Sequence, residues 1–221
     1  MLRDLADDLL AVLLPGRCPG CGARGEPVCD ACAASMRAAP PGRALPGVAW
    51  SGAAFSYEGV ARELVARVKY RNERNAVRWL ARRVAHVCAE SPAEFDAITW
   101  VPASTERRSA RGVDHGALLA RAVGRELAVP ATALLRRAPG PPQTGRPARE
   151  RRAGPALRST RAAADRIVLV VDDVVTTGGT LVAAARALHA CGTRTVLAAT
   201  VARTPRPGSA NPDAAYTRIA V

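Results

Sequence analysis

Lysine is almost absent from this chain. Of its 32 basic residues, Lys69 is the only lysine and the others are arginines. An ammonium is a compact charge on a rotatable stem, whereas a guanidinium is a planar fork, so the two cations are not interchangeable. The one lysine therefore indicates a position that needs a compact cation. Chance survival in an arginine-biased sequence is the alternative interpretation.

Long hydrophobic runs are also missing. No apolar stretch reaches the roughly 20 residues that a membrane-spanning helix needs. The longest one near the start, 9–14, follows Asp4, Asp7 and Asp8, whose charge is opposite to that of a signal peptide's basic opening. We therefore expect a cytoplasmic protein without a membrane span. In that compartment cysteines serve as thiols or metal ligands rather than as disulfides.

Acidic residues are few, 19 against 32 basic ones, which gives a net charge of +13 and a pI near 10.9. The richness in alanine, glycine and arginine can reflect coding bias. Bias does not explain the excess of arginine over acid, which predicts attraction to polyphosphates or nucleic acid. Net charge bears on the partners of the protein and not on its fold.

Two Cys-x-x-Cys pairs separated by seven residues stand near the start, at Cys18, Cys21, Cys29 and Cys32. Four thiolates satisfy tetrahedral zinc with no open position, so the pattern predicts a structural Zn²⁺ site. Because so small a segment cannot bury a core, the ion would supply its folding energy. A redox pair is the alternative, but redox motifs come singly and beside a strand-helix unit.

The 221 residues, 48% hydrophobic, suit one α/β domain with a small appendage. Proline and glycine dominate 38–47, which predicts a linker. We therefore divide the chain into 1–40, with an amphipathic helix over 1–14 and the zinc finger, and 41–221. In the second part the patterns predict strands over 48–57, 95–101, 167–171 and 216–221, and helices over 58–68, 74–90, 113–127 and 181–191. Buried aliphatic strands that alternate with helices are typical of an open parallel sheet flanked by helices.

The most informative segment follows the strand expected over 167–171, where Asp172 and Asp173 stand at the carboxyl end. Five small residues come next: Thr176, Thr177, Gly178, Gly179 and Thr180. A helix amino terminus with hydroxyls and bare backbone favours a phosphate. The two carboxylates would repel it, so we expect them to face hydroxyls or a cation carried by the ligand. A sugar phosphate with a free diol fits both the two carboxylates and the helix amino terminus. An ordinary turn with an acidic amino cap is the alternative.

This segment resembles the phosphoribosyl diphosphate (PRPP) loop of type I phosphoribosyltransferases, which reads aliphatic strand, two acids and Thr-Thr-Gly-x-Thr. The resemblance implies that Asp172 and Asp173 hold the ribose hydroxyls and that residues 176–180 bind the 5′-phosphate. It also implies Mg²⁺, carried with PRPP. On this basis Asp172, Asp173 and Lys69 are the candidate catalytic residues, and Lys69 would act at the diphosphate end.

Hydroxyl and arginine side chains follow the strand expected over 95–101: Ser104, Thr105, Arg107 and Arg111. Ligands collect at the carboxyl ends of strands in open parallel sheets, and arginine forks match phosphate oxygens. In the phosphoribosyltransferase comparison this loop stands in the place of the pyrophosphate loop. A solvated basic loop is the alternative.

Residues 136–161 are rich in proline and glycine and hold eight arginines against one acid, Glu150. With so few apolar residues the segment is expected to be a mobile flap or disordered. Its candidate ligand contacts are Gln143, Arg149, Arg151 and Arg152. Since it offers no aromatic platform for stacking bases, binding of single-stranded nucleic acid would depend on charge alone.

Taken in order from Cys18 to about Arg203, the motifs resemble the ComF family. They are the four-cysteine knuckle, Lys-Tyr, Val-Pro, Arg-Gly, Gln-Thr, Glu-Arg-Arg and Asp-Asp-Val-x-Thr-Thr-Gly. That family pairs an amino-terminal zinc finger with a phosphoribosyltransferase-like domain and is associated with competence, the uptake of single-stranded DNA. One departure is the run 113–115, Val-Asp-His, where the family usually has an aromatic residue and Asn-Gln.

The resemblance implies a protein that binds PRPP or another phosphorylated ribose, and a phosphoribosyltransferase if it is active. Single-stranded DNA and competence proteins would be its partners. Two alternatives stay open: a non-catalytic single-stranded DNA-binding module that retains the fold, and a regulator that senses PRPP. The sequence carries no recognisable set of residues for an acceptor base.

Overall fold

The structure, a computed structural model, describes residues 17–18, 20–24, 28–71, 75–104, 114–137 and 154–205. The helix expected over 1–14 and the strand expected over 216–221 lie outside these ranges. Among the described helices, none has the length and apolarity that a membrane crossing demands.

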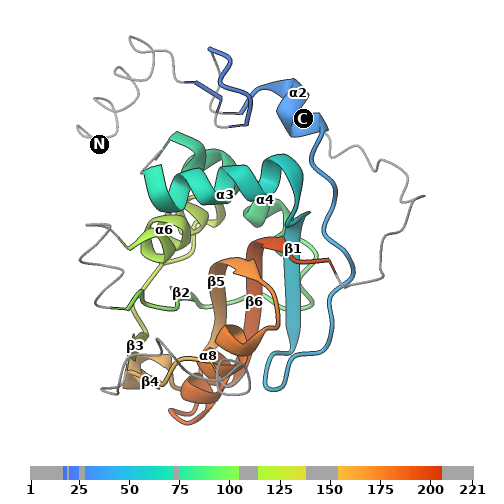
Figure 1. Cartoon of the computed structure of the whole chain (residues 1–221). Coiled ribbons are helices and arrows are strands. Elements are labelled where there is room, and N and C mark those ends of the chain that lie inside the picture. Colours follow the sequence, from blue (N-terminus) through green and yellow to red (C-terminus); the bar gives the residue numbers. More distant parts are fainter. Residues whose placement is uncertain are drawn as a thin grey trace, which may run out of the picture.

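A four-stranded parallel sheet forms the centre of the fold, with the strand order β1-β6-β5-β2 (Figure 1). The strands are β1 (Trp50–Ser56), β2 (Ala97–Trp100), β5 (Ile167–Val175) and β6 (Thr195–Arg203). β5 and β6 occupy the middle and are buried on both faces, which explains their nearly continuous apolar runs. The open parallel sheet expected from the sequence is confirmed.

Helices cover both faces of the sheet (Figure 1). They are α3 (Gly59–Arg71), α4 (Asn75–Cys88) and α6 (His115–Leu127) on one face and α8 (Gly179–His189) on the other. Side chains alternate along β5, so Leu169 and Val171 join the core beneath α3, α4 and α6, while Val168 and Val170 join the core beneath α8. The helices predicted over 58–68, 74–90, 113–127 and 181–191 form, with boundaries shifted by a few residues.

The expected flap over 136–161 has ordered ends. β3 (Leu135–Arg137) and β4 (Leu157–Ser159) pair as an antiparallel hairpin, and a short 3-10 helix, η1 (Arg161–Ala163), follows. Leu135 and Ala163 are buried in the core beneath α8, and this burial anchors both ends of the segment. The prediction was therefore too broad at its margins. The middle, 138–153, with Gln143, Arg149, Arg151 and Arg152, lies outside the described residues.

The four-cysteine segment packs directly on the sheet domain. It contains the short helix α2 (Asp30–Ala34), and its buried residues Cys18, Val28, Cys32 and Met36 belong to the same core as α3 and α4. Its outgoing chain is also hydrogen-bonded to β1, because the Ser56 N–H donates to the Arg37 carbonyl at 2.9 Å. The segment and the sheet therefore share one hydrophobic core.

Candidate functional site

The two acids lie inside β5 and not in a loop after it. β5 continues four residues beyond the expected end, and Asp172 stands in register with Thr200 of β6, followed by Val174 with Ala202. The long neighbouring strand supplies the partner for this extension. Asp172 accepts a hydrogen bond from the Asp173 N–H at 2.9 Å, and both side chains are half-buried at the carboxyl end of the sheet.

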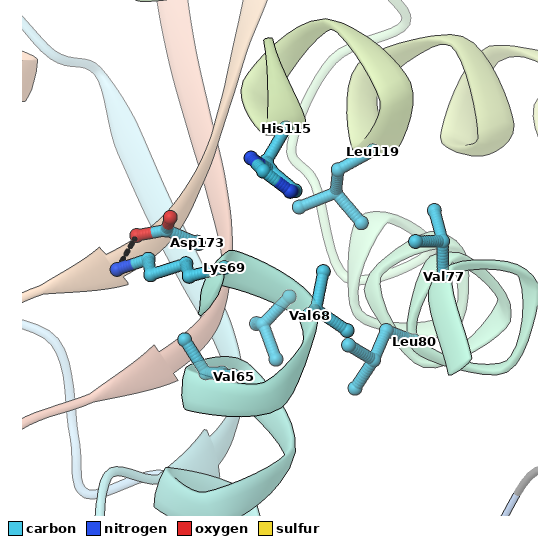
Figure 2. Close-up of a pocket in the computed structure, with 9 residues that line it drawn as sticks. Val65, Val68, Lys69, Val77, Leu80, His115, Leu119 and Asp173 are labelled. Atoms are coloured by element: carbon cyan, nitrogen blue, oxygen red, sulfur yellow. Dashed lines mark ion pairs between the residues drawn. The ribbon is translucent and has the colours of Figure 1, made fainter. Parts of the chain in front are cut away.

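Lys69 pairs with Asp173. Its Nζ lies 2.9 Å from Asp173 Oδ1, with the two side chains 22% and 30% exposed (Figure 2). The sequence predicted a helix that ends at residue 68, whereas α3 continues to Arg71 and carries Lys69 on its last turns. The structure thus joins two of the three candidate catalytic residues, which come from elements about one hundred residues apart.

The loop after β5 has the backbone geometry of an anion site. Gly178 is the amino cap of α8 with φ +81°, and a side chain there would collide with Leu45. Gly178 supplies no side-chain acceptor to the first N–H groups of α8, which stand at the positive end of the helix dipole. Thr177 Oγ1 accepts from the Gly179 N–H at 3.4 Å, and Thr176 hydrogen-bonds Thr204 at 3.2 Å between hydroxyls.

Leu45 is a contributor that the sequence did not reveal. It lies in the expected linker over 38–47, yet it is 6% exposed and packs in the core beneath α8 against Gly178. Its only signal is a lone leucine in a run of proline and glycine. The linker therefore forms one wall of the loop that is expected to bind phosphate.

Asp114 fixes the start of the loop that follows β2. Its Oδ2 accepts from the Ala103 N–H and its Oδ1 from the Ala117 N–H, both at 3.3 Å, so it caps α6 and ties that helix to the loop. Arg137 secures the same loop by donating from Nε to the Pro102 carbonyl at 2.8 Å. Ser104 follows and is half-buried. The other candidates of this loop, Thr105, Arg107 and Arg111, lie outside the described residues.

A mostly apolar pocket opens beside the Lys69–Asp173 pair (Figure 2). Its empty volume is about 320 Å³, part of it open to solvent. Valine and leucine side chains of α3, α4, α6 and β6 form its walls, and His115 adds a polar group whose Nε2 is buried. From the sequence, His115 was noted only as part of the departure over 113–115 and not as a site residue. Because Asp114 is the amino cap of α6, His115 is the first residue of that helix, and there it lines this pocket.

The four thiols fit a zinc site. The Sγ atoms of Cys18, Cys21, Cys29 and Cys32 all lie within 4.8 Å of one another, with Cys21 and Cys29 at 3.6 Å. A regular zinc tetrathiolate with Zn–S bonds of about 2.3 Å places its sulfur atoms about 3.8 Å apart. The set is closed, so a zinc ion held there would be structural. This agrees with the prediction from the Cys-x-x-Cys spacing.

The electrostatics of the cluster also favour a cation. Burial raises the pKa of Cys18, but hydrogen bonds from the backbone of Cys29, Cys21 and Gly20 outweigh it and lower that pKa to about 6. Burial and the neighbouring thiols raise the pKa of Cys32. Four thiols this close cannot all ionise without a counter-charge, which a divalent ion supplies.

Comparison with known families assigns the carboxyl-terminal half. Residues 112–219 match the family model described as the phosphoribosyl transferase domain. This half is a phosphoribosyltransferase-type domain. It includes β5, α8 and the loop between them, whereas α3 with Lys69 and the cysteine cluster precede the matched residues. The expected fold class is confirmed: an α/β phosphoribosyltransferase-type parallel sheet preceded by a four-cysteine cluster.

Three solved proteins show partial similarity to this chain. Glutamine PRPP amidotransferase from B. subtilis, complexed with ADP and GMP, is 21% identical over 58% of this chain and 26% of its own, with a TM-score of 0.40. Adenine phosphoribosyltransferase from Thermoanaerobacter pseudethanolicus is 17% identical over 66% of this chain and 75% of its own, with a TM-score of 0.40. UMP synthase from Leishmania donovani is 24% identical over 63% of this chain and 24% of its own, with a TM-score of 0.37. The chain thus spans about a quarter of the length of the first of these proteins. No curated protein sequence matches it.

Proposed function

We propose that the protein binds PRPP, or another phosphorylated ribose, at the corner formed by β5 and α8. The observation that carries the proposal is the position of Asp172 and Asp173 at the end of β5, directly before a helix amino terminus capped by Gly178. Carboxylates accept hydrogen bonds from sugar hydroxyls, and a helix amino terminus suits a phosphate. The match of residues 112–219 to the phosphoribosyl transferase domain supports this assignment.

In this proposal each group has a separate task. The carboxylates hold the ribose diol, and the first turn of α8 with Thr176, Thr177 and Thr180 holds the 5′-phosphate. Ser104 and the residues after it, Thr105, Arg107 and Arg111, extend toward the diphosphate. Mg²⁺ would enter with the ligand and neutralise diphosphate charge. A ribose hydroxyl on Asp173 would compete with the Lys69 ammonium, which would then be released toward the diphosphate oxygens.

If the protein turns over, the diphosphate departs from the anomeric carbon as positive charge develops on the sugar. Catalysis by this chain would consist of stabilising the departing charge with Lys69 and the arginine-bearing loop and of excluding water. The activity would be that of a phosphoribosyltransferase. Release of diphosphate in the presence of a panel of bases measures this turnover. A protein that binds PRPP without any release would be a PRPP sensor.

Calorimetric titration with PRPP and Mg²⁺ tests the binding site. The double variant Asp172→Asn, Asp173→Asn should lose detectable binding, because amides cannot replace two anionic acceptors for the diol. Asp96→Asn is the matched control. Asp96 accepts from the Ile167 N–H at 2.7 Å at the opposite end of β5, so its loss should leave the affinity unchanged. If the double variant binds like the wild type, the assignment is wrong.

We propose single-stranded DNA binding as a second candidate function, in keeping with the ComF-type link to competence. The supporting observation is the adjacent pair α4 and α6, which carries five arginines against one acid, Glu126. Arg83 lies 4.8 Å from the centre of the Trp79 ring, and Arg78 and Arg82 share Glu126 at 3.8 and 3.6 Å. The basic side chains on these helices suit a phosphate backbone.

Anisotropy of a labelled oligonucleotide tests this second candidate. The affinity should fall steeply with salt and should weaken when Arg78 and Arg82 are replaced by glutamine. If the Asp172→Asn, Asp173→Asn variant binds DNA unchanged, the DNA and PRPP sites are distinct. Competition between PRPP and the oligonucleotide would instead argue for a shared site. An affinity that does not depend on salt would reject binding through these arginines.

A further inference from the structure

We propose that the four-cysteine module, through Val60 and helix α3, positions Lys69 against Asp173. The module here means residues 17–38, as far as the structure describes them. Val60 and the cluster are then positioning elements for the ligand site, and Lys69 is the residue through which they act. This inference rests on the proposed function of the β5–α8 corner.

The first step is the contact between the module and the start of α3. Gly20 lies between the cluster and the helix: a Cβ atom at this position would stand 2.7 Å from Cys32 Sγ and 2.9 Å from Val60 Cγ1. No side chain fits there, so the backbone of the first knuckle is pressed against both groups. Cys18 and Cys32 share the core of Ala61 and Leu64 in the first two turns of α3.

The second step is that the module also contacts the end of β1, directly before the turn that leads into α3. The Ser56 N–H at the end of β1 donates to the Arg37 carbonyl, and Ala38 forms a bridge with Phe55. Only Tyr57 and Glu58 separate β1 from α3. The module therefore contacts both the end of the strand and the first turn of the helix that follows it.

The third step is transmission along the helix. Val60 and Lys69 are nine residues apart, which at about 1.5 Å per residue is roughly 13.5 Å of continuous helix. Leu64 and Val65, 0% and 2% exposed, fix the helix between these two points. Because a packed helix moves as a rigid element, a displacement of the helix at Val60 also displaces Lys69. In the structure the last turn of α3 places Lys69 Nζ 2.9 Å from Asp173 Oδ1 of β5.

The four thiols fit a zinc ion, and a bound ion would hold the knuckle and α2 in the arrangement that supports Val60. Without it the knuckle loses the bonds that fix Cys32 beside Gly20. The first turn of α3 then loses its packing partner. Lys69 is no longer held where it can reach the diphosphate oxygens once a ribose hydroxyl has displaced it from Asp173. We therefore expect zinc removal to weaken ligand binding at a site that contains no zinc ligand.

A thermodynamic cycle tests the inference. PRPP affinity is measured in Mg²⁺ buffer for the wild type and for Lys69→Ala, each with zinc bound and after the zinc has been stripped and the chelator removed. Zinc removal should weaken binding about tenfold in the wild type, a change of about 1.4 kcal/mol. In Lys69→Ala the change should be less than about twofold, because the group that zinc positions is already gone. Equal losses in both proteins, or no loss in the wild type, would overturn the proposal.

Val60→Ala in the zinc-bound protein gives a second route that does not require the metal-free protein to fold. It should weaken PRPP binding in the wild-type background and not in Lys69→Ala. Val87→Ala is the matched control, because Val87 is a half-buried valine on α4 that packs against the same core. A Val87→Ala protein that loses as much affinity as Val60→Ala would mean general loosening of the core and would reject a path through α3.

Hydrogen exchange separates failure of this inference from failure of the proposed function. Zinc removal should accelerate amide exchange in residues 60–69 more than in α8, and this readout needs no ligand. If no protein binds PRPP, the proposed function is wrong and the exchange result decides the link between the cluster and α3. Unchanged exchange in α3 after zinc removal would refute that link.

Discussion

At the scale of single residues, the loop after β5 depends on a position that only glycine fills well. Gly178 has φ +81°, which residues with a side chain rarely adopt, and its missing Cβ leaves the space that Leu45 occupies. The backbone conformation and the packing against Leu45 therefore both require glycine at position 178. Gly192 separates the two effects, since it has φ +84° and its nearest neighbouring atom would stand 3.8 Å from a Cβ.

Gly178→Ala should destabilise the protein more than Gly192→Ala. Both substitutions impose a left-handed backbone on alanine, which costs about 1–2 kcal/mol. Only Gly178→Ala also displaces Leu45 and turns the first N–H groups of α8, so it alone should reduce PRPP affinity. Urea denaturation and calorimetry measure the two effects. Equal destabilisation and equal affinity in the two variants would show that the contact with Leu45 has no role.

Cys88 makes a pH-dependent contribution to stability. Burial raises its pKa from the ordinary 9.0 to about 12. Above pH 9 the unfolded chain loses this proton while the folded protein keeps it, so the contribution is complete below pH 9 and declines as pH rises. The difference in unfolding free energy between the wild type and Cys88→Ala should narrow by about 2 kcal/mol from pH 9 to pH 11. A difference that is constant over this range in urea titrations would contradict the assignment.

At the scale of elements, the patterns that repeat within one segment were predictable. The apolar spacing of α4 and the aliphatic run of β5 are local signals, and the structure has these elements within a few residues of the expected places. β6 was not predicted, although its residues are almost all buried and apolar. The last four residues of β5 were missed because their strand conformation depends on pairing with β6, more than twenty residues away. β3 and β4 are three residues each, too short for a detectable period.

The candidate site likewise has one part that the sequence indicates and another part that only the fold brings together. Asp172, Asp173 and residues 176–180 were proposed as site residues because they are contiguous in the sequence and form a recognisable motif. The neighbours that complete the corner come from elsewhere: Leu45 from the linker, His115 from the start of α6 and Lys69 from α3. Lys69 was noticed only because lysine is otherwise absent, and its contact with Asp173 is a product of the fold.

The amino terminus of α6 depends on one carboxylate with two backbone donors. Asp114→Ala removes the acceptors for Ala117 and Ala103 and should destabilise the protein by about 0.5–2 kcal/mol, the usual range for a lost amino cap. Asp114→Asn keeps one carbonyl oxygen and should lose less. The midpoint of urea denaturation measures both changes. If the two variants unfold at the wild-type midpoint, the cap does not contribute to stability.

At the scale of the whole molecule, the cysteine module and the sheet behave as parts of one body. A boundary between residues 40 and 41 describes the sequence composition, and we retain it as a proposal. The buried surface crosses it, since Cys32 and Met36 pack in one core with Leu64 and Val84. A core shared across a boundary makes unfolding of the two sides cooperative.

Zinc should therefore stabilise the part of the protein that does not bind it. Trp50, Trp79 and Trp100 all lie in the sheet domain, on β1, α4 and β2, so their fluorescence reports that part alone. With free zinc buffered above its dissociation constant, the tryptophan-monitored unfolding free energy should rise by about 1.4 kcal/mol for each tenfold increase in zinc. Cys32→Ser should abolish this dependence and Cys191→Ser, outside the cluster, should retain it. A tryptophan transition that ignores zinc while the cluster still binds it would mean that the module folds independently, and the shared core would then contribute no coupling.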